Sequence, residues 1–389
     1  MVVSSRIHKI QVHKVMNLLI SFFYRIGVWH FGDKPTIRES VIKWFYFVYY
    51  FVFFVSLLCG MISSSNKIHQ STFTASVTVI VGVLLVKLQI LLWEQEMVLG
   101  LLNRISVYSI RNDETFLICS NKLEVFIKFA VVFYGATFVT ATFASFVVPF
   151  LGKEKSIIYS FAFPLDWKSD NFAYFLANAF ITSHTYLTIV VILFSIIIWY
   201  LIMQCSLRYE GLAGDVRIMG RITEQKNGKM SHNAFMQDLK ELIIAHAYLR
   251  GLIDEFESLS SNIFFLQFCT SGACICATTY CLAFDNSENM IERMITIYMF
   301  GYNIAELFMI TYFGNEMMLS SSRRYYSLFE SNWFDQPQTT SKCMIIFGEY
   351  LKQPHALLIG KLFPLTLETF NRILRSAYSM FNILKSTQQ

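Results

Sequence analysis

Long apolar stretches separated by polar segments recur along the chain, and this pattern is the first clue to its fold. A helix that crosses the hydrocarbon core of a bilayer needs about 20 mostly apolar residues. Seven such stretches are present, at about 42–62, 71–93, 125–150, 174–203, 262–284, 290–313 and 355–384. The pattern predicts an all-α membrane protein with seven transmembrane helices that form one domain over residues 1–384.

Lysine and arginine are distributed unequally between the two sides of these spans. The N-terminal segment and segments 94–124, 204–261 and 314–354 together carry 20 of them, whereas the segments on the other side carry 5. Positively charged loops stay preferentially in the cytoplasm. We therefore expect a cytoplasmic N-terminus and, after seven crossings, a short extracellular tail at 385–389. This topology is inverted relative to a G-protein-coupled receptor.

Two long polar segments, 204–261 and 314–354, are expected to form cytoplasmic anchor segments built from extensions of the membrane helices. Within the first, residues at steps of three and four form a seam for packing against other helices. The seam residues are Phe235, Leu239, Leu242, His246, Leu249, Ile253 and Phe256. We interpret His246 as a packing residue, with a proton sensor as the alternative.

The composition fits a protein of the membrane. Hydrophobic residues make up 54% of the chain and charged residues 15%, against about 25% charged residues in an average soluble domain. The run from Val15 to Phe23 follows basic residues and lacks a small-residue cleavage site, so we expect an amphipathic juxtamembrane helix and not a signal peptide. The eight cysteines fit neither a zinc site nor a disulfide framework.

Known catalytic patterns are missing from the sequence. It contains no Gly-x-Ser-x-Gly, no His-Glu-x-x-His and no phosphate-binding loop, and the predicted spans hold no cluster of carboxylates. We therefore expect that the protein is not an enzyme and uses no cofactor or metal ion. We also expect no nucleic-acid partner.

The seventh predicted span carries charges that a lipid-facing helix would not tolerate. One helical stripe along it contains Lys361, Leu365, Glu368, Arg372, Ser376, Ser379 and Ile383. Glu368 and Arg372 are four residues apart and could pair. One hypothesis is a helix that faces an aqueous pathway, which narrows at Ile383. The other is a tilted helix whose charges pair at a seam between subunits. In the second span, Lys87 is expected to snorkel to the cytoplasmic interface.

Aromatic side chains with a few hydroxyl groups gather in the outer halves of spans two, three, four and six. Such a set is typical of an apolar cavity for a small molecule, although each residue alone also fits ordinary helix packing. The candidate ligand-binding residues are Phe73, Val77, Phe138, Thr142, Phe146, Phe180, His184, Leu187, Ile295, Tyr298 and Tyr302.

The C-terminal third resembles the insect odorant receptor family. Its signature is matched within Tyr312–Asp335 by Gly314, Met318, Ser322, Tyr326 and the pair Trp333–Phe334, with Phe334 and Tyr325 as mild departures. The last helix of the family is matched by Pro354, Gly360, Leu367–Phe370, Tyr378, Ser379 and Phe381. Further matches are the helix around His246 and the FPLDW element at 163–167.

This resemblance implies the odorant-tuning subunit of a cation channel that assembles as a tetramer with a common co-receptor. It implies that anchor segments join the subunits and that the last helix lines the pore. The family's outer gate matches Ile383 and position 387, where the co-receptor is apolar and this chain has Thr387. Odorants would bind between the outer halves of spans two, three, four and six. The expected partners are a volatile odorant, the co-receptor and the lipid bilayer, and the expected location is the plasma membrane of olfactory sensory neurons.

Two other receptor classes are alternatives. A gustatory receptor would end in a Thr-Tyr-x-x-x-x-x-Gln-Phe pattern, which Leu384–Gln389 does not match. A G-protein-coupled receptor would carry an acidic-Arg-aromatic triplet at the inner end of its third span, an Asn-Pro-x-x-Tyr in its seventh and a cysteine in an outer loop. All three features are missing.

Overall fold

The computed structural model describes residues 8–32, 34–63, 68–146, 161–162, 164–167, 170–219, 232–284 and 290–386. The described elements are mainly α-helices: α1 (Lys14–Arg25), α2 (Ile37–Ser63), α3 (Ile68–Trp93), α4 (Gln95–Ser106), α5 (Asp113–Phe146), α7 (Asn171–Arg217), α9 (His232–Phe284), α10 (Met290–Phe329), α11 (Gln338–Leu351) and α12 (Leu367–Ser386). A 3-10 turn, η1 (Trp333–Asp335), and the short strands β1 (His8–Ile10), β2 (Tyr108–Ile110), β3 (Leu358–Ile359) and β4 (Phe363–Pro364) complete them.

Six of these helices are long and apolar enough to cross a membrane: α2, α3, α5, α7, α9 and α10. They coincide with the first six predicted spans, so the all-α membrane fold is confirmed. The juxtamembrane helix expected around Val15 is present as α1, which begins one residue earlier.

The seventh span differs from the expectation, which was a single helix over 355–384. The chain instead forms the antiparallel hairpin β3–β4, and the helix begins at Leu367. Gly360 and Lys361 both adopt positive φ at the hairpin turn, and Pro364 lacks the amide hydrogen that a helix interior requires. Lys361 and Leu365 therefore do not belong to the helical stripe, and α12 is shorter than the span that we expected.

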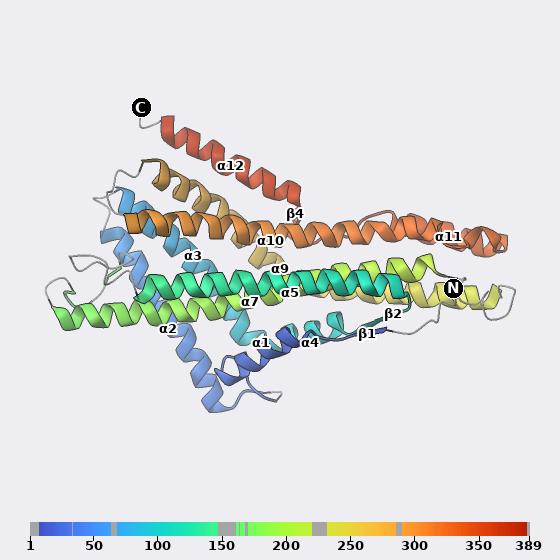
Figure 1. The fold of residues 1–389 in the computed structure, drawn as a ribbon, viewed down its shortest axis with the longest axis horizontal. Coiled ribbons are helices and arrows are strands. Elements are labelled where there is room, and N and C mark those ends of the chain that lie inside the picture. The colour runs from blue at the N-terminus through green and yellow to red at the C-terminus, as the bar shows by residue number, and fades with distance from the viewer. Residues whose placement is uncertain are drawn as a thin grey trace.

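Helix α7 is the centre of the bundle. Its side chains are buried on all faces from Val191 to Leu207, and it packs against α5, α9 and α10, most extensively against α10. In a bilayer, such contacts are stabilised by close packing of side chains and not by exclusion of water. Figure 1 shows these long helices running along the long axis of the molecule while α2 crosses them obliquely.

Helices α7, α9 and α10 extend beyond the other spans toward the end that carries α11 and the β1–β2 sheet, here called the anchor end (Figure 1). The C-terminal end of α12 lies toward the opposite end. All seven predicted seam residues on α9 are buried. Phe235, Leu239 and Leu242 form a second apolar core with Met344 and Phe347 of α11. The predicted helical extension of the fifth span is thus present as one continuous helix.

Candidate pore helix and ligand-binding residues

Helix α12 has two faces of opposite character. Ala377 is buried, and the half-buried rings of Phe370 and Phe381 lie 5.6 Å from Phe308 of α10 and 6.4 Å from Phe284 of α9. The opposite face is solvent-exposed in the single subunit and carries Glu368, Arg372, Ser376, Ser379 and Ile383. The helix is therefore attached to the bundle by its apolar side and presents the predicted stripe outward.

The ion pair expected on this stripe is formed. Arg372 Nη2 donates to Glu368 Oε1 at 2.7 Å, and both side chains remain about two-thirds or more exposed. At high exposure such a pair adds little stability, so its charges remain available to water or to another subunit. Thr387, the other expected gate residue, lies outside the described residues.

The β3–β4 hairpin fixes where α12 begins, because it is hydrogen-bonded to α9. Ser261 Oγ donates to the carbonyl of Leu358 at 3.0 Å, and its backbone carbonyl accepts from the amide of Gly360 at 3.2 Å. One turn earlier on α9, the Glu257 carboxylate accepts from the amide of Leu358 at 3.1 Å. Burial of the Glu257 side chain raises its pKa.

Gly314, the first residue of the family signature, allows the hairpin to approach α10. A Cβ at this position would lie 2.5 Å from the backbone carbonyl oxygen of Leu365 and 2.6 Å from its Cγ. Leu365 itself is fully buried. Only glycine permits this contact, so the segment that precedes α12 is held by α9 on one side and by α10 on the other.

Some candidate ligand residues come together across α5, α7 and α10. Tyr302 of α10 stacks on Phe133 of α5, with ring centroids 6.2 Å apart, and Phe138 lies 6.2 Å from Tyr186 of α7. Tyr298 is half-buried one turn before Tyr302. Phe133 and Tyr186 are not among the residues predicted from the sequence. Phe133 lies five residues, or about 140° around the helix, from Phe138, outside the single face that we considered.

Phe180 and His184 face a different helix. His184 is fully buried and stacks on Tyr49 and Phe53 of α2, with centroid distances of 4.1 and 4.3 Å. Its ring nitrogens lie 2.8 Å from the carbonyl oxygen of Phe180 and 3.0 Å from that of Tyr49. A neutral imidazole has one N–H and therefore donates to one of these two carbonyls at a time. The stacking on Tyr49 and Phe53 connects α7 to α2.

The remaining candidate ligand residues differ in their surroundings. Val77 and Leu187 are buried in the main core, Phe73 packs against it, and Phe146 at the end of α5 is exposed. Half-buried positions are taken by Thr142 and Ile295. That these residues line one ligand cavity stays a prediction.

Lys87 does not snorkel, which corrects the expectation. Its Nζ lies 2.6 Å from Oε1 of Glu306 on α10 and 3.1 Å from Oγ of Ser195 on α7, and its side chain is 1% exposed. The sequence contained a signal for this contact, because two opposite charges inside predicted spans are expected to pair within the bundle.

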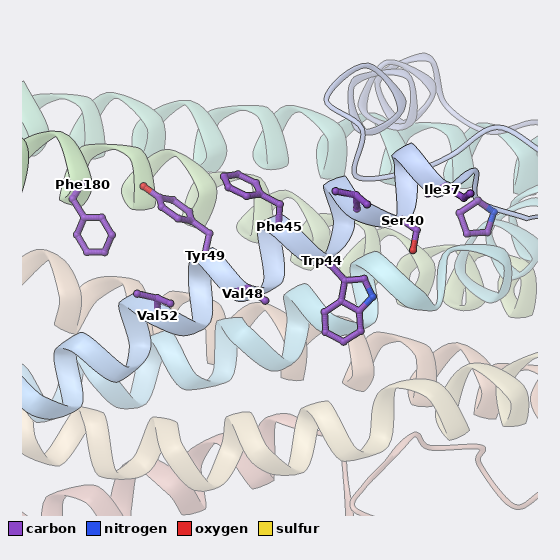
Figure 2. A pocket seen from close by; sticks show the side chains of 10 residues that line it. Ile37, Ser40, Trp44, Phe45, Val48, Tyr49, Val52 and Phe180 are labelled. Atoms are coloured by element: carbon purple, nitrogen blue, oxygen red, sulfur yellow. The ribbon is translucent and has the colours of Figure 1, made fainter.

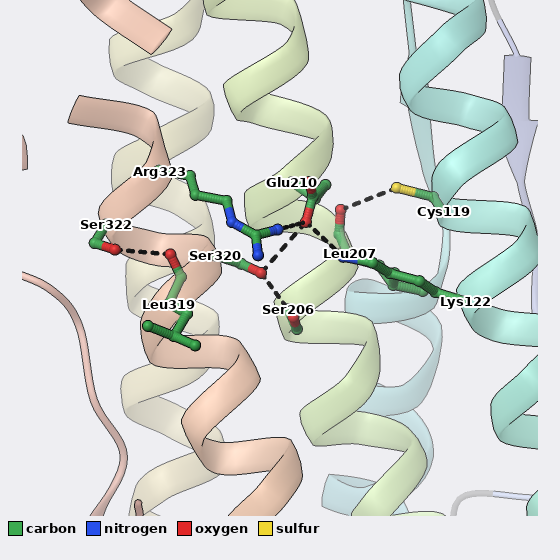
Figure 3. A network of polar contacts seen from close by, with 9 residues as sticks. All are labelled: Cys119, Lys122, Ser206, Leu207, Glu210, Leu319, Ser320, Ser322 and Arg323. Atoms are coloured by element: carbon green, nitrogen blue, oxygen red, sulfur yellow. Dashed lines mark hydrogen bonds and ion pairs between the residues drawn. The ribbon is translucent and has the colours of Figure 1, made fainter. Parts of the chain in front are cut away.

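A second ionic network joins α5, α7 and α10 near the anchor end. Glu210 Oε2 accepts from Lys122 Nζ at 2.9 Å and from Arg323 Nη1 at 2.7 Å (Figure 3). Ser320 donates to the same oxygen at 3.5 Å and also pairs with Ser206. One carboxylate on the central helix therefore holds cations from both neighbours.

His246 packs between aromatic rings in the anchor segment. It is buried, and its ring is 6.0 Å from that of Phe347 and 5.4 Å from that of Tyr350. Burial, together with the nearby positive charge of Arg324 and Arg250, lowers the pKa of His246 to about 3. The imidazole is neutral at physiological pH, which supports the packing interpretation and argues against a proton sensor.

Comparison with known sequences reveals clear relatives. Residues 67–378 match the family model described as 7tm Odorant receptor. Odorant receptor 23a of Drosophila melanogaster is 29% identical over 258 residues, which cover 64% of each chain. Putative odorant receptor 92a of the same species is 22% identical over 242 residues, covering 60% of this chain and 55% of that one. The chain thus aligns with less than two thirds of the length of these relatives.

Two solved structures share the fold. The insect olfactory receptor OR5 from Machilis hrabei superimposes with a TM-score of 0.78 at 14% identity, over 95% of this chain and 98% of that one. The structure of the same receptor in complex with eugenol gives a TM-score of 0.76 at 12% identity, over 95% and 99% of the two chains. Relatedness this distant is evidence of a common architecture.

The bundle, with six described helices long and apolar enough to cross a membrane, defines a multi-pass membrane protein. The family model covers well over half of the sequence. The chain belongs to the 7tm odorant receptor family, a family of receptors and not of enzymes. The resemblance found in the C-terminal third is confirmed, and the gustatory and G-protein-coupled alternatives are set aside.

Proposed function

We propose that this chain is the odorant-binding subunit of a ligand-gated cation channel that opens together with a co-receptor subunit. The observation that carries the proposal is the division of α12 into a buried apolar face and an exposed face with Glu368, Arg372, Ser376 and Ser379. A polar face at membrane depth is stable only against water or protein. A pore shared between subunits provides both.

The pore would narrow toward the C-terminal end of α12. Ile383 follows Ser379 by one turn on the same face and is 61% exposed. An apolar side chain at this position would close the pathway by excluding water, and a small movement of α12 would rehydrate it. The assembly is proposed to be a heteromeric tetramer in the plasma membrane of olfactory sensory neurons.

The ligand is proposed to be a small volatile molecule. The aromatic contacts of Tyr302 and Phe138 across α5, α7 and α10 provide the kind of apolar surroundings, with a few hydroxyl groups, that hold such molecules. The related receptor from Machilis hrabei has been solved with eugenol. This likeness supports the proposed class of ligand and leaves the particular odorant open.

Helix α10 would connect the ligand to the pore. It carries Tyr298 and Tyr302 in one half, while Phe308 contacts Phe370 of α12 and Gly314 receives the hairpin before α12. A ligand that binds one arrangement of α10 more tightly shifts the population toward it. Because α12 is attached to α10, its position changes with that shift.

The test is current recorded from cells that express the chain with and without a co-receptor, over a panel of volatile odorants. Odorant-evoked current is expected only with both subunits. Glu368→Lys is expected to change cation selectivity, and Ile383→Ala to raise the basal current. Glu124→Lys is the matched control, because Glu124 is an exposed member of an i,i+4 pair with Lys128 on α5. Unchanged selectivity and basal current in both pore variants would contradict the pore assignment.

A further inference from the structure

Lys87, Ser195 and Glu306 form a polar network inside the apolar bundle. Lys87 Nζ lies 2.6 Å from Glu306 Oε1, and Ser195 Oγ lies 3.1 Å from the lysine nitrogen and 3.3 Å from the same glutamate oxygen. All three side chains are buried or nearly so. Because opposite charges attract more strongly where water is excluded, the network holds α3, α7 and α10 at their present spacing.

The network lies close to the candidate ligand-binding residues of the same three helices. On α3, α7 and α10, the candidates Val77, Leu187 and Tyr302 precede the network residue by 10, 8 and 4 positions. These separations correspond to about 15, 12 and 6 Å along each helix. Tyr302 and Glu306 are about one turn apart and lie on the same face of α10. A molecule held beside Tyr302 is thus about one turn from the ion pair.

Side chains already fill the space between these helices. Val77, Leu187 and Tyr302 are at most 9% exposed, and protein interiors are packed as densely as organic crystals. An odorant that binds among these residues therefore requires the helices to move apart. Any such movement of α10 relative to α3 stretches the contact between Lys87 and Glu306.

Helix α10 presents the ion pair and the last helix on different sides. Phe308 follows Glu306 by two residues, which is about 200° around the helix. Its ring lies 5.6 Å from that of Phe370 on α12. Because α10 is one continuous helix from Met290 to Phe329, a displacement at Glu306 also displaces the contact with α12.

The apolar groove along the outward face of α2 is a separate feature (Figure 2). It has a volume of about 910 Å³ and is lined by the α2 segment and by Phe180 of α7. None of Lys87, Ser195 and Glu306 lines it. The ion pair therefore controls the spacing of α3, α7 and α10 and not this outer surface.

We propose that the ion pair of Lys87 and Glu306 opposes activation by the odorant, because it resists the separation of α3 and α10. This inference rests on the proposed function and names the residues that regulate it. Weakening the pair favours the arrangement in which the helices are further apart. The odorant then works against a smaller opposing free energy, so the channel opens at a lower odorant concentration.

The experiment records current from cells that express the chain with a co-receptor, using the odorant of the panel that evokes the largest current from the unaltered chain. The double variant Lys87→Met with Glu306→Leu removes both charges and leaves neither unpaired. It is expected to lower the half-maximal odorant concentration about five-fold or more, since coupling effects typically begin near that factor, and to raise the basal current. Lys87→Glu with Glu306→Lys restores an attractive pair and is expected to respond like the unaltered chain.

Two further variants separate the ion pair from general effects of substitution. Ser195→Ala keeps both charges but loses the hydroxyl that contacts them, so it is expected to lower the half-maximal concentration by a smaller factor. Lys128→Met with Glu124→Leu is the matched control, because these residues form an exposed pair on α5. The control is expected to change neither the half-maximal concentration nor the basal current.

Hydrogen exchange of α12 in the purified chain provides a readout without current. It is expected to be faster in the apolar double variant, because α10 then holds α12 less firmly. If the unaltered chain gives odorant-evoked current but the apolar double variant keeps its half-maximal concentration and basal current, the inference is overturned while the proposed function stands. If no variant gives current, the proposed function fails, and unchanged exchange of α12 overturns the inference as well.

Discussion

Lys87 on α3 and Glu306 on α10 form an ion pair inside the helix bundle. The Nζ and Oε1 atoms are 2.6 Å apart, and the two side chains are 1% and 10% exposed. Ser195 of the central helix α7 contacts both partners, at 3.1 Å from the lysine and 3.3 Å from the glutamate. Three spans are thus connected at one polar point within an apolar core.

Removing one partner of this pair is expected to destabilise the protein strongly. Lys87→Met leaves Glu306 buried without its counter-charge, which costs about 3–5 kcal/mol in buried pairs. The double variant Lys87→Met with Glu306→Leu removes both charges and is expected to regain most of the loss. Thermal unfolding of the detergent-purified protein measures both effects.

The control for this prediction is Lys128→Met. Lys128 and Glu124 form an i,i+4 pair at 2.8 Å on α5, but their side chains are 73% and 61% exposed. Little change in unfolding temperature is expected, because water screens exposed pairs. If Lys87→Met is no more destabilising than Lys128→Met, the buried pair does not hold the spans together.

Gly314→Ala is expected to displace the hairpin that precedes α12. The new Cβ would lie 2.5 Å from the carbonyl oxygen of Leu365, which is backbone and cannot rotate away. Overpacking of this kind costs about 1–3 kcal/mol. Gly301→Ala on the same helix is the control, because a Cβ there meets nothing within 4 Å. That variant is expected to be neutral or more stable by up to about 1 kcal/mol, and equal unfolding temperatures for the two would contradict the close contact.

Ser261→Ala is expected to loosen the attachment of the hairpin to α9. The substitution removes the hydrogen bond to the Leu358 carbonyl and the one that Ser261 Oγ accepts from the amide of Lys361 at 3.3 Å. A buried polar group left without a partner costs about 1–3 kcal/mol. Hydrogen exchange of residues 357–366 should accelerate. Ser258→Ala, at an exposed position three residues earlier, should leave that exchange unchanged, and a similar acceleration in both would argue against the attachment.

Asp215→Asn is expected to stabilise the anchor end at neutral pH. Burial raises the pKa of Asp215 to about 6, although the amide of Arg111 donates to its carboxylate at 3.1 Å. The pKa of this carboxyl group is higher in the folded than in the unfolded protein, so its protonation favours folding. This stabilisation is fully present below the pKa of the unfolded state and is lost as the pH rises through about 6. A shift of about two units corresponds to roughly 3 kcal/mol at most.

The measurement is the unfolding temperature of Asp215→Asn and of the unaltered chain between pH 4 and pH 8. The variant should be more stable at pH 7.5, and the difference should shrink toward pH 4. Glu349→Gln, at an exposed position on α11, should show no such pH-dependent difference. If the unfolding temperatures of Asp215→Asn and the unaltered chain differ by the same amount from pH 4 to pH 8, ionisation of Asp215 is not the cause of the difference.

The sequence alone predicted a feature correctly wherever the contacts that determine this feature lie within one helix. The apolar stretches located six helices of membrane-spanning length, and the steps of three and four on α9 identified a seam that is buried throughout. The ion pair of Glu368 and Arg372 followed from their spacing of four. Each of these depends on the geometry of one helix, which the order of residues specifies directly.

Only the tertiary structure decided which helices meet. Lys87 lies 219 residues from Glu306. The sequence places both charges inside predicted spans, but it does not show that these two spans are neighbours. The same holds for His184, whose face pattern fitted a cavity but whose Nε2 contacts the Tyr49 carbonyl of α2, and for the hairpin that shortens α12. A helical pattern shows which face is apolar or polar. The identity of the surface against that face depends on the packing of distant segments, and no local pattern records it.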